Sequence, residues 1–278
     1  MTVRVIADST SDIPTHIADE LGIQILPLYI NVGDREYRDG IDMTREQFYT
    51  NLPTFTSHPQ TSAPGPRTFI EAWEQLAEQG ATEIISVHVA SSLSAVTSVA
   101  RMAAEEFRRI PIHIIDSGQI SLGVGFQAIA AARAALAGQT VSEIVAQVED
   151  IARRTHVFAA LDTLEFMARS GRVSNLVAGI GGFLQLKPVL KMHDNLAGSE
   201  RVRTTRRAFE RIAELVNGVG PLVEAAFVHA HANERLNALR EQLAHFLPDK
   251  PVWSVEITPA IGAHVGPNTV GIVLISQS

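Results

Sequence analysis

Two kinds of segment alternate along the first 155 residues, and this alternation limits the folds that the chain can adopt. Short apolar runs of strand length cover residues 3–7, 25–32, 83–89 and 112–116. Stretches with helical character cover residues 66–79, 91–109, 120–137 and 141–154. Apolar strands separated by helices favour a parallel sheet that is covered on both faces. The sequence therefore predicts an N-terminal domain over residues 1–155, with a mostly parallel sheet and helices on both of its faces.

The pattern changes in the second half of the chain. Residues 188–192 and 196–202 flank the pair Asp194-Asn195, which is typical of a tight hairpin turn. Further strands are expected at residues 157–161, 223–229, 252–257 and 270–275, and helices at residues 164–168, 205–216 and 233–246. Hairpins mixed with helices favour an α+β domain with a mixed or antiparallel sheet over residues 156–278. The predicted fold class is therefore α/β with two domains.

Composition excludes several classes of function. Hydrophobic residues make up 46% of the 278 residues, which is enough for a core and an apolar ligand cavity. The net charge of -7 argues against nucleic acid as a partner, since phosphate binding needs a basic face. The chain has no cysteine, which excludes a thiol nucleophile and cysteine-bound zinc. The polar N-terminal region lacks the apolar core of a signal peptide, and no apolar run approaches the length of a membrane span, so a cytoplasmic location is expected.

Short polar clusters interrupt the apolar pattern at residues 8–12 (DSTSD), 61–66 (TSAPGP), 91–94 (SSLS) and 262–267 (GAHVGP). In open parallel sheets, ligands bind just beyond the carboxyl ends of the strands. Hydroxyl and backbone N–H groups at such junctions can donate hydrogen bonds to an anion. The imidazole of His264, expected in a loop between glycines, can ionise near neutral pH and balance a carboxylate. Taken singly, each cluster is equally consistent with an ordinary helix cap or turn.

Other motifs are weaker. Residues 123–128 match a dinucleotide fingerprint, but the residues before them are expected inside a continuing helix, which argues against that use. His229 and His231 alternate at a strand end with no third ligand in view, so a metal site is not expected. A basic cluster could dock an acidic partner or a phosphate, or could form a solvated helix start; it comprises Arg201, Arg203, Arg206 and Arg207.

Six motifs occur in one order along nearly the whole chain: Asp8-Ser9-Thr10-Ser11-Asp12, Thr61-Ser62-x-Pro64, Ser91-Ser92-Leu93-Ser94, residues 164–173 (LEFMARSGRV), Leu186-Lys187-Pro188-Val189-Leu190 and Ala263-His264-Val265-Gly266-Pro267. Together they resemble the DegV family of fatty-acid-binding proteins. The resemblance implies two domains with a long-chain fatty acid held between or within them, and no catalysis, metal or cofactor. It also implies a partner fatty acid kinase that phosphorylates the bound acid, and it is compatible with peripheral membrane contact during ligand exchange.

The resemblance further implies the residues of the site. The ligand carboxylate would be held by hydroxyl groups and by His264, while Arg203 would dock the kinase; the hydroxyl groups are those of Thr61, Ser62, Ser91, Ser92 and Ser94. Residues 120–136 and 176–184 offer apolar walls for the acyl chain, the second with glycines that let backbone approach a thin ligand.

Two alternatives remain open at this point. The same hydrogen-bond donors could serve another small organic acid or a phosphate, and the shape of the pocket would discriminate between them. A serine of residues 91–94 could instead act as the nucleophile of a hydrolase or acyltransferase, with His264 as base and Asp8 or Asp116 as the orienting carboxylate. No G-x-S-x-G elbow supports this second alternative.

Overall fold

A parallel sheet forms the first half of the molecule. The computed structural model describes residues 2–172 and 186–277. The sheet has the order β2-β1-β6-β7, and every neighbouring pair is parallel. Its strands are β1 (Val3–Asp8), β2 (Ile23–Leu26), β6 (Glu83–His88) and β7 (Ile112–Asp116). Five of the six residues of β6 are buried, as expected for a strand covered on both faces.

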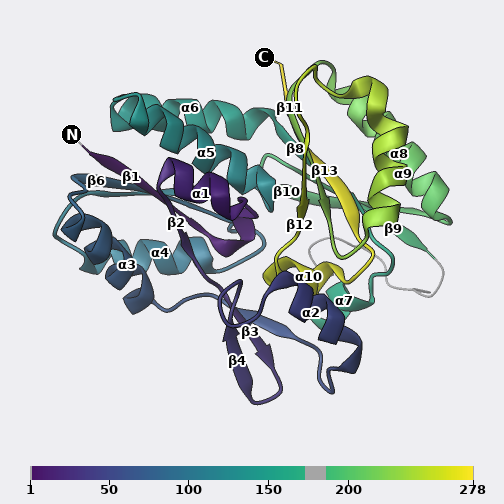
Figure 1. The fold of residues 1–278 in the computed structure, drawn as a ribbon, viewed down its shortest axis with the longest axis horizontal. Coiled ribbons are helices and arrows are strands. Elements are labelled where there is room, and N and C mark those ends of the chain that lie inside the picture. The colour runs from purple at the N-terminus through teal and green to yellow at the C-terminus, as the bar shows by residue number, and fades with distance from the viewer. Residues whose placement is uncertain (1, 173–185, 278) are drawn as a thin grey trace.

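Helices cover both faces of this sheet (Figure 1). One layer contains α1 (Thr15–Leu21), α5 (Leu122–Leu136) and α6 (Val141–Arg154), and the other contains α3 (Pro66–Glu78) and α4 (Val96–Glu106). The buried residues of α3 are spaced three and four apart and form one apolar stripe: Phe69, Ala72, Trp73 and Leu76. The spacing of Thr140 and Glu143 predicts a capping box, and one is present at the start of α6.

A six-stranded mixed sheet forms the second half, in the order β10-β9-β8-β13-β11-β12. Its strands are β8 (Thr155–Ala160), β9 (Lys187–His193), β10 (Leu196–Val202), β11 (Leu222–His229), β12 (Trp253–Glu256) and β13 (Val270–Ser276). The predicted hairpin joins β9 to β10, with Asp194 at φ 47° and Asn195 at φ 60°. Helices α8 (Thr205–Val219) and α9 (Asn233–Leu243) cover one face (Figure 1). A parallel sheet followed by a mixed sheet confirms the predicted fold class.

A third sheet was not predicted. Residues 25–32, expected as one strand, form the end of β2 and then β3 (Tyr29–Val32), which lie in different sheets. Pro27 interrupts the run because it has no N–H to donate, and the next amide, that of Leu28, donates to the Ser9 hydroxyl. Strand β3 pairs with β4 (Arg35–Arg38) and β5 (Gln60–Ser62), and this small antiparallel sheet projects below α10 (Pro259–Val265) in Figure 1.

Two predicted helix starts were wrong, and both corrections bear on the site. Residues 91–94 are not helical, since α4 begins only at Val96 and a separate turn precedes it. Helix α5 begins at Leu122, directly after Ser121, whose φ of 56° is incompatible with a helix. The argument used against the dinucleotide fingerprint was therefore wrong. Gly125 of that fingerprint lies against backbone, because an added Cβ would lie 2.6 Å from the Ser11 carbonyl oxygen.

Short helices complete the fold. They are α2 (Arg45–Asn51) and α7 (Glu165–Arg169), together with the 3-10 turns Ser9–Ser11, Leu52–Thr54 and Ala244–Phe246. The spacing of Thr44 and Gln47 predicts a capping box, and one is present at the start of α2. Within the described ranges, no helix combines the length and the apolar character that crossing a membrane requires.

Candidate functional site

A mostly apolar cavity lies where the carboxyl ends of β1 and β6 meet one face of the mixed sheet. It encloses about 1080 Å³ of empty space when its open mouth is included. Most of its lining side chains are aliphatic: Leu28, Val89, Leu93, Ile120, Val157, Ala159, Leu190, Ala197, Val228, Ile257, Ala260, Ile261 and Val265, with Met167 and Met192. Such walls suit a ligand with a large apolar part.

The mixed sheet supplies one wall through the alternation of its strands. Val157 and Ala159 of β8 line the cavity, whereas Phe158 and Ala160 belong to the core under α8 and α9. Ala159 pairs with Gly271 on one neighbouring strand and with Leu190 on the other. Two of these three paired positions carry almost no side chain, which leaves room for the cavity at this point of the sheet. Of the two predicted walls, residues 120–136 contribute only Ile120 and Ser121 to the lining, and residues 176–184 lie outside the described residues.

Thr61 and His264 form the polar centre of the cavity. The Thr61 hydroxyl lies 2.8 Å from His264 Nε2, although the two residues are 203 positions apart. Strand β5 positions Thr61, and the last turn of α10 positions His264. His264 was expected in a loop, but Thr258 and Pro259 begin a short helix that carries it. Gly262 allows α10 to pack closely, since an added Cβ would lie 2.5 Å from the Tyr49 hydroxyl.

The expected ionisation of His264 near neutral pH is corrected by its surroundings. Burial lowers the pKa of His264 to about 3, with smaller contributions from the positive charge of Arg172 and from His58. The ring is therefore neutral at pH 7 in this state. Its Nδ1 atom is buried and has no hydrogen-bond partner among the described residues. A neutral ring with a proton on Nε2 donates to Thr61 and leaves the Thr61 hydroxyl proton free for a ligand.

We expect the ligand-free protein to keep His264 neutral down to about pH 4, since its pKa lies near 3. Nitrogen NMR shifts of the imidazole, assigned with a His264→Asn variant, would measure this. His16, on α1 outside the cavity lining, serves as the internal comparison in the same spectra. A His264 titration midpoint above pH 6 would contradict the expectation.

The predicted hydroxyl residues separate into two groups. Thr61 and Ser94 line the cavity, and so does His264. Ser62 accepts a hydrogen bond from Asn31, and Ser92 donates to Asn195 at the tip of the β9–β10 hairpin. The backbone N–H of Ser91 donates to Asp116. Of the four residues 91–94, the serine that reaches the cavity is thus Ser94, a choice that sequence spacing alone had left open.

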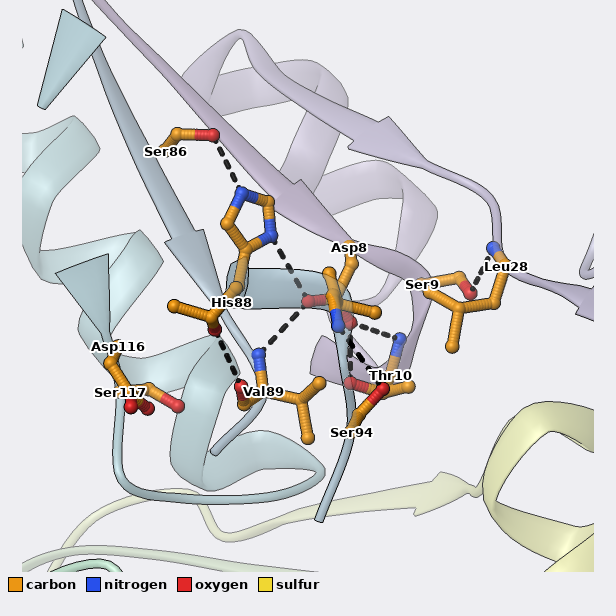
Figure 2. Close-up of polar contacts among 12 residues, drawn as sticks. Asp8, Ser9, Thr10, Leu28, Ser86, His88, Val89, Ser94, Asp116 and Ser117 are labelled. Atoms are coloured by element: carbon orange, nitrogen blue, oxygen red, sulfur yellow. Dashed lines mark hydrogen bonds and ion pairs between the residues drawn. The ribbon is translucent and has the colours of Figure 1, made fainter. Parts of the chain in front are cut away.

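Thr10 also reaches the cavity, through a network that the sequence did not predict (Figure 2). Its hydroxyl and its N–H both donate to Asp8 Oδ1. Asp8 Oδ2 accepts from Val89 N–H and lies 3.2 Å from His88 Nδ1, while His88 Nε2 lies 2.7 Å from the Ser86 hydroxyl. Because the Thr10 hydroxyl proton is directed to Asp8, the oxygen of Thr10 can only accept from a ligand or a neighbour.

Arg172 is a lining residue that sequence reasoning missed. It lines the cavity and donates to the Ser170 carbonyl, and none of the described carboxylates forms an ion pair with it. Its membership of the LEFMARSGRV motif was the available signal. Arg203, by contrast, is exposed between β10 and α8 and does not line the cavity.

The residues expected for a hydrolase centre are not arranged as a catalytic triad. Asp8 is engaged by His88 rather than by His264, and Asp116 accepts from the backbone N–H groups of Ser91 and Gly118. The free Nδ1 of His264 has no carboxylate to orient it. The Ser86-His88-Asp8 chain has the order of a triad, but all three residues are fully buried and none of them lines the cavity. Within residues 2–172 and 186–277, no group of three His, Asp or Glu side chains could hold a metal.

Known proteins share both the sequence and the architecture. Residues 2–277 match the family described as "Uncharacterised protein, DegV family". A DegV domain-containing protein of Streptomyces coelicolor is 33% identical, with 99% of each chain covered. A DegV family protein from Thermus thermophilus, whose structure is described as showing fatty acid binding, is 30% identical with a TM-score of 0.90 and 100% of both chains covered.

A second solved structure agrees. DegV from Bacillus subtilis, described as a fatty acid binding protein, is 27% identical with a TM-score of 0.90, and both chains are covered completely. The family match spans nearly every residue and the relative from Streptomyces spans 99% of the chain. The chain therefore belongs to the DegV family.

Proposed function

We propose that this protein binds a long-chain fatty acid without transforming it, with the acyl chain in the apolar cavity and the carboxylate at the polar centre. The observation that carries the proposal is the combination of largely aliphatic walls with Thr61, Ser94, His264 and an Arg172 that lacks a carboxylate partner among the described residues. The relatives from Thermus thermophilus and Bacillus subtilis, both described as binding fatty acids, support it.

The energetics suit such a ligand. Burying about 15 methylene groups contributes roughly 12 kcal/mol at about 0.8 kcal/mol each. Loss of motion on binding costs about 4–15 kcal/mol, which offsets much of that gain, so the acyl chain is the main favourable contribution and the head group must not add a further cost. An unpaired buried carboxylate would cost several kcal/mol, so the head group must meet donors. The acyl chain thus provides most of the favourable binding free energy, and the polar centre fixes the position of the carboxylate.

The polar centre offers those donors. Once His264 Nε2 donates to Thr61, the hydroxyl proton of Thr61 points to the ligand. Arg172 adds a positive charge, and a bound carboxylate would also raise the pKa of His264 from its low ligand-free value. The bound acid leaves unchanged, because no nucleophile with an oriented base faces it in the described ranges.

The broader role that we propose is that of a carrier in the cytoplasm. The protein would present the acid to a fatty acid kinase that docks near Arg203, and it would exchange ligand during peripheral contact with a membrane. The exposure of Arg203, at the turn before α8, supports a docking role. We also propose domains at residues 1–155 and 156–278, since every strand of the mixed sheet begins at Thr155 or later.

The direct test is mass spectrometry of the ligands released when the purified protein is denatured. We expect a C14–C18 fatty acid at about one molecule per protein chain, because the acyl chain proposed for the cavity has about 15 methylene groups. Repeated absence of acyl chains, together with no uptake of added fatty acid, would reject the proposal. Release of a short polar acid instead would favour a binding module for another small acid.

Thr61→Val should weaken fatty acid binding about tenfold or more while the fold persists. The change removes one hydroxyl from a carboxylate, worth roughly 1–3 kcal/mol, and leaves His264 Nε2 unpaired. Titration with a fluorescent fatty acid measures the dissociation constant. Thr50→Val, the same change at an exposed position of α2, is the control. Equal affinity for Thr61→Val and wild type would remove Thr61 from the site.

A further inference from the structure

Two buried carboxylates meet the start of α10. Asp12 is 1% exposed and Asp39 is 3% exposed. Asp12 Oδ1 accepts from the Thr258 N–H at 2.7 Å, and Asp39 Oδ2 accepts from the Thr258 hydroxyl. Neither carboxylate lines the cavity, but α10 does, through Ala260 and its neighbours and through His264. Asp12 and Asp39 therefore bind the start of α10, a helix of the site, without lining the cavity themselves.

The same two carboxylates also hold other segments. Asp12 Oδ2 accepts from the hydroxyl of Ser121, a cavity-lining residue, at 2.6 Å, and Arg45 Nη2 lies 3.3 Å from Asp12 Oδ1. Asp39 accepts from Ser9 at 2.7 Å. We call the set of six residues the aspartate clasp: Asp12, Asp39, Ser9, Arg45, Ser121 and Thr258. It joins the turn after β1, the segment between β4 and α2, the start of α5 and the start of α10.

Stability does not account for the clasp. Burial raises the pKa of Asp12 to about 6 and also raises that of Asp39, despite the hydroxyl and arginine partners. Arg45 Nε is buried without a hydrogen-bond partner among the described residues, and the Asp39 carboxylate has one further contact, with the backbone N–H of Ala260. Thr258, the N-cap residue of α10, gives its hydroxyl to Asp39 rather than capping its own helix. An apolar contact would hold α10 at lower cost, but it would define its position less sharply.

We propose that Asp12 and Asp39 are positioning residues for the bound acid. They fix the start of α10 in place and in rotation, and His264 follows six residues later on the same short helix. A shift of the helix start is carried to His264 Nε2 and changes its 2.8 Å contact with Thr61. Asp12 also holds Ser121, a lining residue next to α5, so one carboxylate aligns two segments of the cavity lining. This inference rests on the proposed fatty acid function.

The test compares Asp12→Asn and Asp39→Asn with Asp42→Asn. Asp42 is a partly exposed carboxylate of the same segment, and it pairs with Arg38 rather than with α10. The first measurement is the rate at which bound palmitic acid leaves the protein for serum albumin. We expect both clasp variants to lose the acid about tenfold faster than wild type, the effect of roughly 1.4 kcal/mol, and Asp42→Asn to match wild type.

The second measurement needs no ligand. The imidazole nitrogen shifts of His264 should change in both clasp variants and stay as in wild type in Asp42→Asn. Thr258→Val removes the hydroxyl group that donates a hydrogen bond to Asp39, so this variant should lose the acid faster, as the aspartate variants do. Thr258→Ser keeps the hydroxyl group and should lose the acid at the wild-type rate. This pair tests the clasp even if an aspartate variant does not fold.

The outcomes separate the two proposals. Wild-type loss rates and unchanged His264 shifts in every clasp variant would overturn the positioning role and leave fatty acid binding intact. If wild-type protein binds no palmitic acid, the proposed function fails, and changed His264 shifts would still support control of α10 by the clasp. A fall in thermal stability with unchanged loss rate and unchanged His264 shifts would show a structural role alone and would also overturn the inference.

Discussion

Replacing Ala159 with phenylalanine is expected to weaken binding of a C16 fatty acid by roughly a hundredfold or more. Ala159 lies on the cavity face of β8, between Gly271 and Leu190 of the adjacent strands. An aromatic ring there displaces several methylene groups of the ligand, and each displaced methylene costs about 0.8 kcal/mol. Because the ring points into existing space, the fold should persist. Titration with palmitic acid and a thermal unfolding curve measure the two effects.

A graded series sharpens this test. Ala159→Ser changes the volume little and should bind palmitic acid within a few-fold of wild type, whereas Ala159→Leu should be intermediate. Shorter acids should recover part of the affinity in Ala159→Phe, because they no longer compete with the ring for space. Unchanged palmitic acid affinity in Ala159→Phe would place the acyl chain elsewhere, and the apolar cavity would then need another occupant.

The second large effect concerns stability and pH. The free energy of unfolding of Asp12→Asn relative to wild type should rise by about 2 kcal/mol between about pH 4.5 and pH 7. In the folded protein the pKa of Asp12 is about 6, above its ordinary value of 3.8, because the carboxyl is buried. Wild type therefore loses stability as the pH rises through this window, since folding must bury the ionised form. The asparagine variant has no proton to lose.

The comparison must be a difference between two proteins at each pH. Burial lowers the pKa of His264 to about 3 and that of His156 to about 4. The contribution of these two histidines to the free energy of unfolding therefore falls as the pH falls below 6.5, the opposite direction to that of Asp12. Both histidines are present in both proteins, so their effect cancels in the difference. Denaturant unfolding curves give the values, and Asp42→Asn is the exposed control. If the difference in free energy of unfolding between Asp12→Asn and wild type is constant with pH, the pKa of Asp12 is not raised in the folded state.

The two expectations for Asp12→Asn belong together. A variant whose stability relative to wild type rises toward neutral pH, and which still releases fatty acid faster, would show that the wild-type carboxylate is retained for the geometry of the site. Strained or desolvated groups are commonly found where a site needs a defined position rather than a stable one. Ser121 is a strained residue of this kind, because its φ is 56° directly before α5 and its hydroxyl donates a hydrogen bond to Asp12.

Local patterns predicted much of the architecture. The apolar runs at residues 83–89 and 112–116 form β6 and β7 of the parallel sheet, and the capping boxes at Thr44 and Thr140 begin α2 and α6. The pair Asp194-Asn195 turns the β9–β10 hairpin. Each of these signals acts over a few residues, through hydrogen bonds or backbone preferences that neighbouring side chains decide by themselves.

Local patterns failed where a distant segment decides the outcome. The division of residues 25–32 between two sheets depends on Pro27 and on the distant Ser9 hydroxyl that accepts from the Leu28 amide. The helical position of His264 depends on Asp12 and Asp39, which hold Thr258 from more than 200 residues away. Burial then lowered the pKa of His264, a change that no spacing of residues in the sequence reports.

By itself, the sequence determined the strands of the parallel sheet and the helices between them, the change from parallel to mixed pairing, the set of polar clusters and the DegV resemblance, because these depend on local periodicity and on motifs in order. Only the tertiary structure decided that Ser94 rather than Ser91 or Ser92 reaches the cavity, that Thr10 and Arg172 join it, and that α10 is held by buried carboxylates. The reason is physical: a site is made by side chains that meet after long-range packing, and burial there sets their protonation and their hydrogen-bond direction.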